Sequence, residues 1–476
     1  MKLIICLLLL GMPWLSTAEP TAAVPIRALA LQEVVDAALR AFPALLAAEQ
    51  RKQTAAGELQ TAQGGFDTVL KSQNRWSVTG LYENSQYDWL IEQPTSVMGS
   101  TFFGGWRRGT GSYPVYEGKS LTASDGEFRM GVNIPLWRNR DIDRRRASLQ
   151  QAELGQLIAG HEFDQTLLDV RRQASHRYWD WVLAGIRLRT AEQLLRVAEQ
   201  RNEGIKQRVA AGDLPEFEAL DNQRAIIERQ ERRVAAQRLL EQSAIQLSLY
   251  WRDEQGQPQL PTQDLLPPDF PVQEPRIEHD FTTVLAIANA QRPELKRLAL
   301  QSQQTETELA LQQNQQNPAL DLQVIGAQDI GQSQGKLNRE ELYVGLNVDI
   351  PLQQRVAGGR VQVASANLRR LHWERRGTED RVSAEIKDVL SALNAARQRL
   401  ILSQQQQQAA RQLETGERER FDLGETSLLF VNLRELASGD ASLQVADAAA
   451  GLFKAHADYQ AILANPLTIS GDTYEH

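Results

Sequence analysis

Two stretches of the chain alternate apolar and polar residues in the same way. Residues 127–136 read Glu-Phe-Arg-Met-Gly-Val-Asn-Ile-Pro-Leu, and residues 341–352 read Glu-Leu-Tyr-Val-Gly-Leu-Asn-Val-Asp-Ile-Pro-Leu. An alternation with a period of two predicts a β-strand with one apolar and one polar face. Each stretch ends in Ile-Pro-Leu and is followed by a long, charged helical pattern. Few architectures need this strand-then-helix unit twice, so the duplication limits the possible folds.

The two halves of the chain repeat one order of elements, at an offset of roughly 210–250 residues. The first element of each half is a helix, expected at residues 31–63 and 281–316, with a proline after its first turns. Gly64-Gly65 and Asn317-Pro318 are expected to end these helices, because glycine and proline disfavour helical continuation. A strand, a loop and a second strand follow in each half.

The longest elements are two helices expected at residues 144–211 and 360–423. Both are rich in Ala, Leu, Gln, Glu and Arg. At 1.5 Å per residue, each would be on the order of 100 Å long, which implies coiled-coil packing. A turn that contains glycine follows each one, and a returning helix is expected at residues 216–250 and 428–463.

These elements predict the domain organisation of the chain. We expect a signal peptide at 1–18, a first repeat at 19–257 (strand hairpin 66–137, helical hairpin 144–250), a linker at 258–280, a second repeat at 281–466 (strand hairpin 318–352, helical hairpin 360–463) and a tail at 467–476.

The N-terminal residues have the pattern of a secretory signal: Lys2, an apolar run and the small residues Ser16-Thr17-Ala18. The only cysteine, Cys6, lies inside that run and is not preceded by the small residues of a lipoprotein site. We therefore expect a mature protein with no lipid anchor, no disulfide and no thiolate metal site. The formal net charge of -8 argues against binding to nucleic acid.

No later stretch approaches the 18 consecutive apolar residues of a membrane helix. If the protein spans a membrane, its strands must therefore form a closed barrel. We predict four strands per chain, whereas the smallest closed membrane barrels have about eight. The chain should then oligomerise to cover its strand edges, and three copies would supply twelve strands.

The predicted loop of the first half, residues 83–125, is long and rich in aromatics and glycine. Loops of this length inside a folded unit are usually functional. Two interpretations stay open. Its aromatic residues Tyr87–Tyr116 form a lid over the external mouth, or they anchor the chain in the lipid headgroup region.

The order of elements resembles the TolC-like outer-membrane efflux proteins over residues 29–466. The residues that carry the resemblance are Arg292-Pro293-Glu294-Leu295, Asn317-Pro318, the two Ile-Pro-Leu strand ends, and the turns Arg208-Val209-Ala210-Ala211-Gly212 and Arg420-Phe421-Asp422-Leu423-Gly424. None of these motifs is specific by itself. Together they are a strong indication of the family, because they occur in the same order twice after a signal peptide.

The resemblance implies a mixed α/β membrane protein that forms a homotrimer. Its twelve-stranded transmembrane β-barrel would lie in the outer membrane lipid and continue into a periplasmic α-helical coiled-coil tunnel. A periplasmic adaptor would bind the helical tips and connect them to an inner-membrane pump. The protein would be a passive conduit, opened at its tips when recruited.

The resemblance implies an adaptor-docking set at the tips: Gly212, Leu214, Gly424, Glu425, Thr426 and Ser427. It also points to a possible tunnel gate, where Glu218 matches an acidic position of the family and Asp221 lies one turn further on. The second repeat departs from the family, because Phe421 replaces a tyrosine and Phe430 stands where an acidic residue would be, so the gate is either polar or aromatic. The alternative for the glycines is a helix end that needs a positive φ. The alternative for Glu218 and Asp221 is a solvated helix surface.

No motif for catalysis is found. The six histidines lack metal-ligand spacing, and Gly104-Gly105-Trp106-Arg107-Arg108-Gly109 lacks the lysine of a phosphate-binding loop. We therefore expect no enzyme, cofactor or metal. Three functions remain open: small-molecule efflux with a proton-driven pump, polypeptide secretion with an ATP-driven transporter, and a periplasmic coiled-coil scaffold or adaptor.

Overall fold

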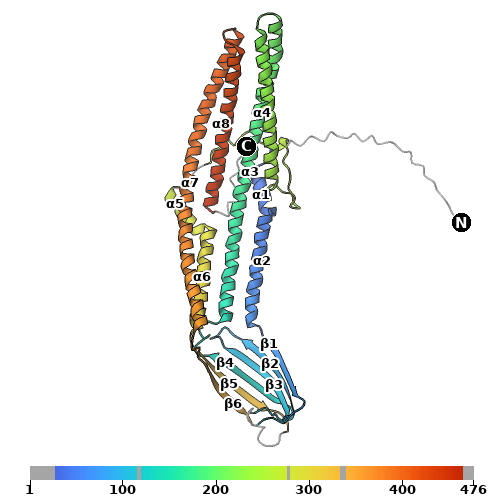
Figure 1. Cartoon of the computed structure of the whole chain (residues 1–476), viewed down its shortest axis with the longest axis vertical. Coiled ribbons are helices and arrows are strands. Elements are labelled where there is room, and N and C mark those ends of the chain that lie inside the picture. Colours follow the sequence, from blue (N-terminus) through green and yellow to red (C-terminus); the bar gives the residue numbers. More distant parts are fainter. Residues whose placement is uncertain (1–26, 115–118, 276–278, 333–338, 465–476) are drawn as a thin grey trace, which may run out of the picture.

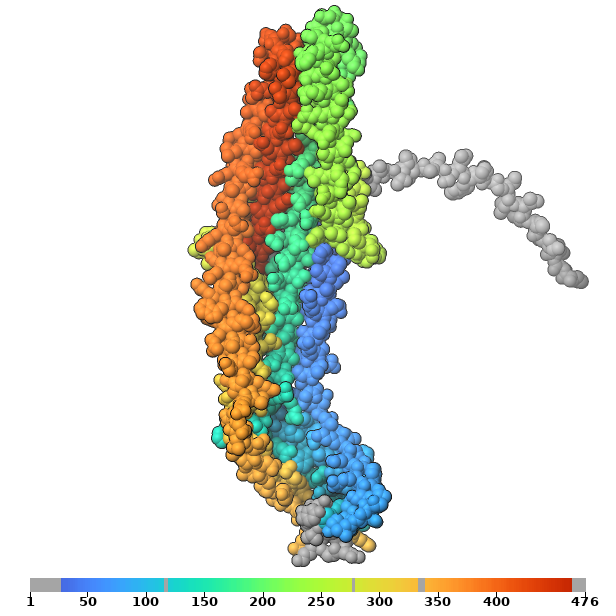
Figure 2. Space-filling model, in the orientation of Figure 1, coloured from blue at the N-terminus to red at the C-terminus, as the bar shows by residue number. Residues whose placement is uncertain are grey.

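The protein is a long, narrow molecule with a β-sheet at one end and two helical hairpins at the other (Figures 1 and 2). The structure is a computed structural model that describes residues 27–114, 119–275, 279–332 and 339–464. The expected signal peptide at 1–18 and the expected tail at 467–476 lie outside the described residues.

Two unbroken helices run from the sheet to the opposite end of the molecule (Figure 1). These are α3 (Arg144–Ala210) and α7 (Arg355–Asp422), with 67 and 68 residues. Each turns back into a shorter helix, α4 (Glu216–Ser248) or α8 (Leu428–Ile462). Asp143 caps the start of α3, because its side chain accepts from the backbone N–H groups of Arg145 and Arg146.

Proline splits the first helix of each half into two. The pairs are α1 (Leu31–Ala41) with α2 (Pro43–Gln63), and α5 (Phe281–Gln291) with α6 (Pro293–Asn314). Phe42 and Arg292 are extended, with ψ of 127° and 123°. The ring of the following proline disfavours the helical conformation at these positions. The expectation of one continuous helix in each half is therefore wrong.

The main hydrophobic core lies where the short helices meet the middle of α3 and α7. Trp181 on α3 is fully buried there. Phe270, from the segment between the two halves, stacks on Trp179 and Phe453 with ring centroids 5.6 and 5.8 Å apart. The connecting segment, which includes the short 3-10 helix η3 (Gln263–Leu265), is thus packed into the core.

The sheet has six strands in the described residues, not the four that the sequence predicted. They pair in sequence order, each antiparallel to the next. The strands are β1 (Val69–Ser77), β2 (Asn84–Pro94), β3 (Thr101–Gly111), β4 (Glu127–Pro135), β5 (Ala319–Asp329) and β6 (Glu341–Asp349). A short 3-10 helix, η1 (Gly64–Phe66), leads from α2 into β1.

Two of the six strands come from residues 83–125, which we expected to be a loop. β2 and β3 form a hairpin between β1 and β4. The lid and headgroup-anchor interpretations both assumed an irregular loop, and that assumption is wrong. Tyr116, assigned to the same loop, lies outside the described residues.

In the part of the chain that the structure describes, the helices are too polar or too short to cross a membrane.

Candidate functional site: the helical tips and the two-faced sheet

The two tip turns have the same backbone geometry. At the end of α3, Gly212 has a φ of +81°, and at the end of α7, Gly424 has a φ of +78°. In each turn the next residue donates its N–H back across the helix end, Asp213 to the Arg208 carbonyl at 2.9 Å and Glu425 to the Arg420 carbonyl at 2.8 Å. This is a Schellman cap. No atom lies within 4 Å of a Cβ built on either glycine, so the positive φ explains the glycines without a packing requirement.

The predicted docking residues surround these turns. Gly212, Gly424 and Glu425 are exposed, whereas Leu214, Thr426 and Ser427 are partly buried. The sequence analysis missed three exposed apolar side chains beside them: Phe217, Leu220 and Leu423, with 67%, 68% and 75% of their surface exposed. The sequence could have revealed them, because they are large apolar residues within two otherwise highly polar helical ends.

The predicted gate residues fall into two groups. Glu218, Asp221 and Phe421 are buried within the chain, whereas Phe430 is about half exposed. Asp221 accepts a hydrogen bond from the Asn432 amide at 3.1 Å. Phe421 packs with Ile205 on α3 and with two residues of α8. A solvated surface for Glu218 and Asp221 is therefore wrong.

A buried cluster of charged residues, which we call the arginine cluster, lies behind the tips. Its centre is the Glu435 carboxylate on α8, which is fully buried. Arg201 and Arg229 each donate to it at 2.8 Å, and Arg418 donates to it from Nε at 3.1 Å. Because these arginines belong to α3, α4 and α7, one carboxylate joins all four helices.

The charge balance of the arginine cluster favours an ionised Glu435. Burial acts to raise the pKa of this carboxyl, but Arg201 and Arg229 attract the carboxylate and donate hydrogen bonds to it, so the net effect lowers its pKa. Sequence inspection offered no signal for the cluster, because its members lie on separate helices up to 234 residues apart.

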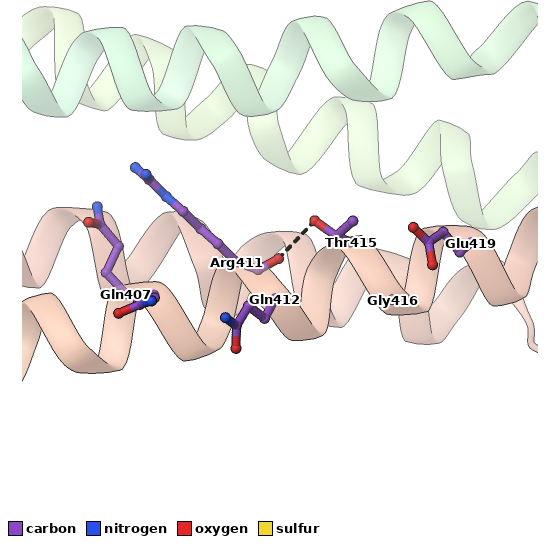
Figure 3. A pocket seen from close by; sticks show the side chains of 7 residues that line it. Gln407, Arg411, Gln412, Thr415, Gly416 and Glu419 are labelled. Carbon is purple, nitrogen blue, oxygen red and sulfur yellow. Dashed lines mark hydrogen bonds between the residues drawn. The ribbon is translucent and has the colours of Figure 1, made fainter.

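The helical surface near the tips has two hollows. One, of about 320 Å³, lies between α3, α7 and α8 and is lined by Arg201, Phe421 and Glu435 among others. The other is an open groove of about 490 Å³ along α7, lined by Gln407, Arg411, Thr415 and Glu419 among others (Figure 3). Figure 3 shows these polar side chains projecting from one stretch of α7.

The sheet has one apolar and one polar face. On β4, Phe128 and Met130 belong to the apolar face, and on β6 Val344 and Leu346 belong to the same face. Leu342 of β6 lies on this face as well. These five side chains each have between 55% and 76% of their surface exposed. Arg129, Glu127 and Asp329 belong to the opposite face. An apolar face this extensive is uncommon on a protein surface in contact with water.

Within residues 27–114, 119–275, 279–332 and 339–464, no group of three or more His, Cys, Asp or Glu side chains is arranged to hold a metal ion.

Comparisons with known proteins find similarity in structure. No family model and no curated protein sequence matches the chain. Among solved structures, the outer-membrane channel OprN has 15% sequence identity and a TM-score of 0.67, and the match covers 91% of this chain and 89% of that one. The CmeC outer-membrane channel of Campylobacter jejuni has 15% identity and a TM-score of 0.64, with 91% and 85% covered. The open state of the MtrE outer-membrane channel of Neisseria gonorrhoeae has 14% identity and a TM-score of 0.64, with 96% and 98% covered.

Each match covers at least 91% of this chain and at least 85% of the other, so the similarity is not confined to one part of the fold. The protein therefore has the fold of the TolC-like outer-membrane channels, as the resemblance in the sequence implied.

Proposed function

We propose that this protein is the outer-membrane channel of a tripartite export system. The observation that carries the proposal is the exposed apolar face of the sheet, joined to helices that end in two exposed turns. Lipid acyl chains would cover the apolar face without an unfavourable contact with water. The similarity of the whole chain to outer-membrane channels supports the same function.

The channel forms from three copies of the chain. The outer edges of β1 and β6 have no partner strand in the described residues. An edge without partners exposes a row of N–H and C=O groups, which lipid cannot hydrogen bond. Pairing of β6 in one copy with β1 in the next closes the sheet into a barrel. The predicted signal peptide, without a lipid anchor, would deliver the chain to the outer membrane through the periplasm.

The helices form the periplasmic tunnel, and their tips bind the adaptor that connects the channel to an inner-membrane pump. Thr426 and Glu425 are docking residues on one turn, and Leu214 is one on the other. The exposed Phe217, Leu220 and Leu423 add apolar contact area. Phe430 is the gate residue best placed to face the tunnel, whereas Asp221 and Phe421 hold the gate segment within the chain.

The scaffold or adaptor alternative is disfavoured by the same sheet. A protein that works only in the periplasm gains nothing from exposed Met130 and Val344 side chains, which would promote aggregation. Small-molecule efflux with a proton-driven pump is the form we propose, and polypeptide secretion with an ATP-driven transporter is the alternative.

The test is photo-crosslinking in living cells, with the probe in place of Thr426 and a matched probe in place of Gln237, an exposed residue of α4 away from the turn. The expected result is capture of a periplasmic adaptor from position 426 only. An adaptor that works with an ATP-driven transporter would support polypeptide secretion. Equal capture from both positions, or none, would contradict the docking assignment.

A further inference from the structure

The β2–β3 hairpin continues the two-faced pattern of the sheet. Trp89 and Ile91 of β2 lie in register with Trp106 and Gly104 of β3, which in turn pair with Phe128 and Met130 on the apolar face of β4. Trp89, Ile91 and Phe102 have 46%, 51% and 52% of their surface exposed. The apolar face therefore extends without interruption across the hairpin.

The opposite face of the hairpin carries charged side chains that bind to charged side chains of β4. Asp88 of β2 accepts from Arg129 of β4 at 2.8 Å, although β3 lies between the two strands. The residue of β3 opposite Arg129 is Gly105, whose missing side chain leaves room for the guanidinium to cross. Arg107 of β3 forms an ion pair with the fully buried Glu127 of β4.

Two apolar residues interrupt this charged face, and local packing explains both. Phe103 is paired in register with Gly131, and its ring carbon is 2.6 Å from the position of a Cβ built there. Leu90 is paired with Gly105, where a built Cβ would meet the leucine Cδ1 at 3.0 Å. Each side chain thus covers a glycine of the neighbouring strand.

The hairpin is part of the wall of the sheet. β2 pairs with β1 over nine residues and with β3 over eleven, and β3 pairs with β4 over seven. β1 is joined to β4 only through these two strands. At 11 residues each, β2 and β3 have the length of a strand that crosses an outer membrane. A lid or plug would instead leave β1 and β4 as direct neighbours.

We propose that the β2–β3 hairpin spans the membrane, so that each copy contributes six strands and the trimer closes a barrel of eighteen. This inference rests on the proposed function, which supplies the membrane and the three copies. The number is even, as antiparallel closure between identical copies requires. Barrel diameter grows roughly linearly with strand number, so this barrel is roughly 1.5 times as wide as one of twelve strands.

Charges on the free edges of the sheet fit this closure. Lys71 and Arg75 lie on the polar face of β1, and Glu341 and Asp349 lie on the polar face of β6. Three of these residues also have charged partners inside the chain: Lys71 pairs with Glu92 at 2.6 Å, Glu341 with Lys119 at 2.8 Å and Asp349 with Arg138 at 3.3 Å. When β6 of one copy pairs with β1 of the next, the two edges bring opposite charges together on the polar face.

The test is a spin-label accessibility scan in lipid nanodiscs. Each position from Gln86 to Ile91 is replaced by cysteine in turn, for example Asp88→Cys and Trp89→Cys, in a chain with Cys6→Ala. Since Cys6 is the only native cysteine, each label occupies one site. Labels at 87, 89 and 91 should be severalfold more accessible to oxygen, and less to a water-soluble nickel complex, than labels at 86, 88 and 90.

A control scan over 342–347 in β6, with Tyr343→Cys and Val344→Cys, separates this inference from the proposed function. Alternation in both scans supports the eighteen-stranded barrel. Alternation in β6 with uniform water accessibility at 86–91 overturns it and leaves the channel intact. Absence of alternation in both scans overturns the outer-membrane proposal, and the barrel with it.

Discussion

The arginine cluster makes a strong prediction for Glu435→Gln. Glutamine keeps the shape of the side chain but removes the one carboxylate that Arg201, Arg229 and Arg418 share. These arginine side chains are 16%, 1% and 41% exposed, so water can solvate the first and third in part, but not Arg229. Removal of one partner from a buried ion pair destabilises a protein by about 3–5 kcal/mol.

We expect the lower end of that range, about 3 kcal/mol, because the glutamine oxygen still accepts one hydrogen bond. The lost stabilisation lowers the free energy that is needed to open the tip helices locally. At 1.36 kcal/mol per factor of ten, it should accelerate amide hydrogen exchange near residues 428–440 of α8 on the order of 100-fold. Hydrogen exchange read by mass spectrometry measures this directly, with peptides from β4 as an internal reference.

The matched control is Glu419→Gln, an exposed acidic residue of α7, which should leave exchange unchanged. A second variant tests the physical cause. Arg229→Met in the Glu435→Gln background removes the orphaned buried charge and should restore most of the protection. Less than a threefold change in Glu435→Gln would refute the reasoning, because it would mean that Arg229 is solvated or paired elsewhere.

Four further predictions concern other parts of the chain. Because the pKa of Glu435 is lowered in the folded protein, its stabilisation is complete above the usual value of 4.5 and is lost only as the pH falls through the lower folded pKa; pH-corrected exchange of α8 should be flat from pH 7 to 5 and rise in stronger acid. Gly424→Ala should destabilise its turn by about 1–2 kcal/mol through the positive φ, with a smaller loss for Gly424→Asn, as seen in exchange of the α7 end. Trp181→Ala should destabilise the fully buried core by about 3–5 kcal/mol and lower the melting temperature, whereas the exposed Trp373→Ala should not. Asp143→Ala should cost about 1 kcal/mol at the start of α3, read as faster exchange at Arg145 and Arg146.

The helices could be predicted well from the sequence because their signals are local. Gly212 and Gly424 mark the tip turns. The prediction of one opening helix in each half underestimates Pro43 and Pro293, which break that helix at the residue before each proline. The alternation in β4 and β6 is likewise a property of neighbouring residues. Such features depend on residues only a few positions apart, so they can be predicted without knowledge of tertiary contacts.

The β2–β3 hairpin could not be predicted in this way because its composition imitates a loop. Gly104, Gly105 and Gly109 are rare in strand interiors, and the runs Trp89-Leu90-Ile91 and Phe102-Phe103 hide the period of two. These features become consistent with a strand only when Leu90 and Phe103, which break the alternation, are seen to pair with Gly105 and Gly131 of the neighbouring strands.

The burial of Glu218 and Asp221 also depends on distant parts of the chain. From the sequence alone, a carboxylate on a polar helix is expected to be exposed to solvent. Asp221 accepts from the nearby Arg224, but also from Asn432, which is 211 residues away. Local sequence carries no record of that pairing, and the same holds for Arg229 and Glu435.

The continuity of α3 and α7 has a mechanical consequence. Beyond the central core, the two helical hairpins are tied to each other by the arginine cluster. Together they form one cantilever, clamped at the core and free at its turns. The free part is about as long as α4, whose 33 residues extend for roughly 50 Å. A rotation of roughly 5° at the clamp then moves the turn by about 4 Å, because displacement grows with lever length. The fold thereby converts a small adjustment in tightly packed side chains into a large movement at the far end.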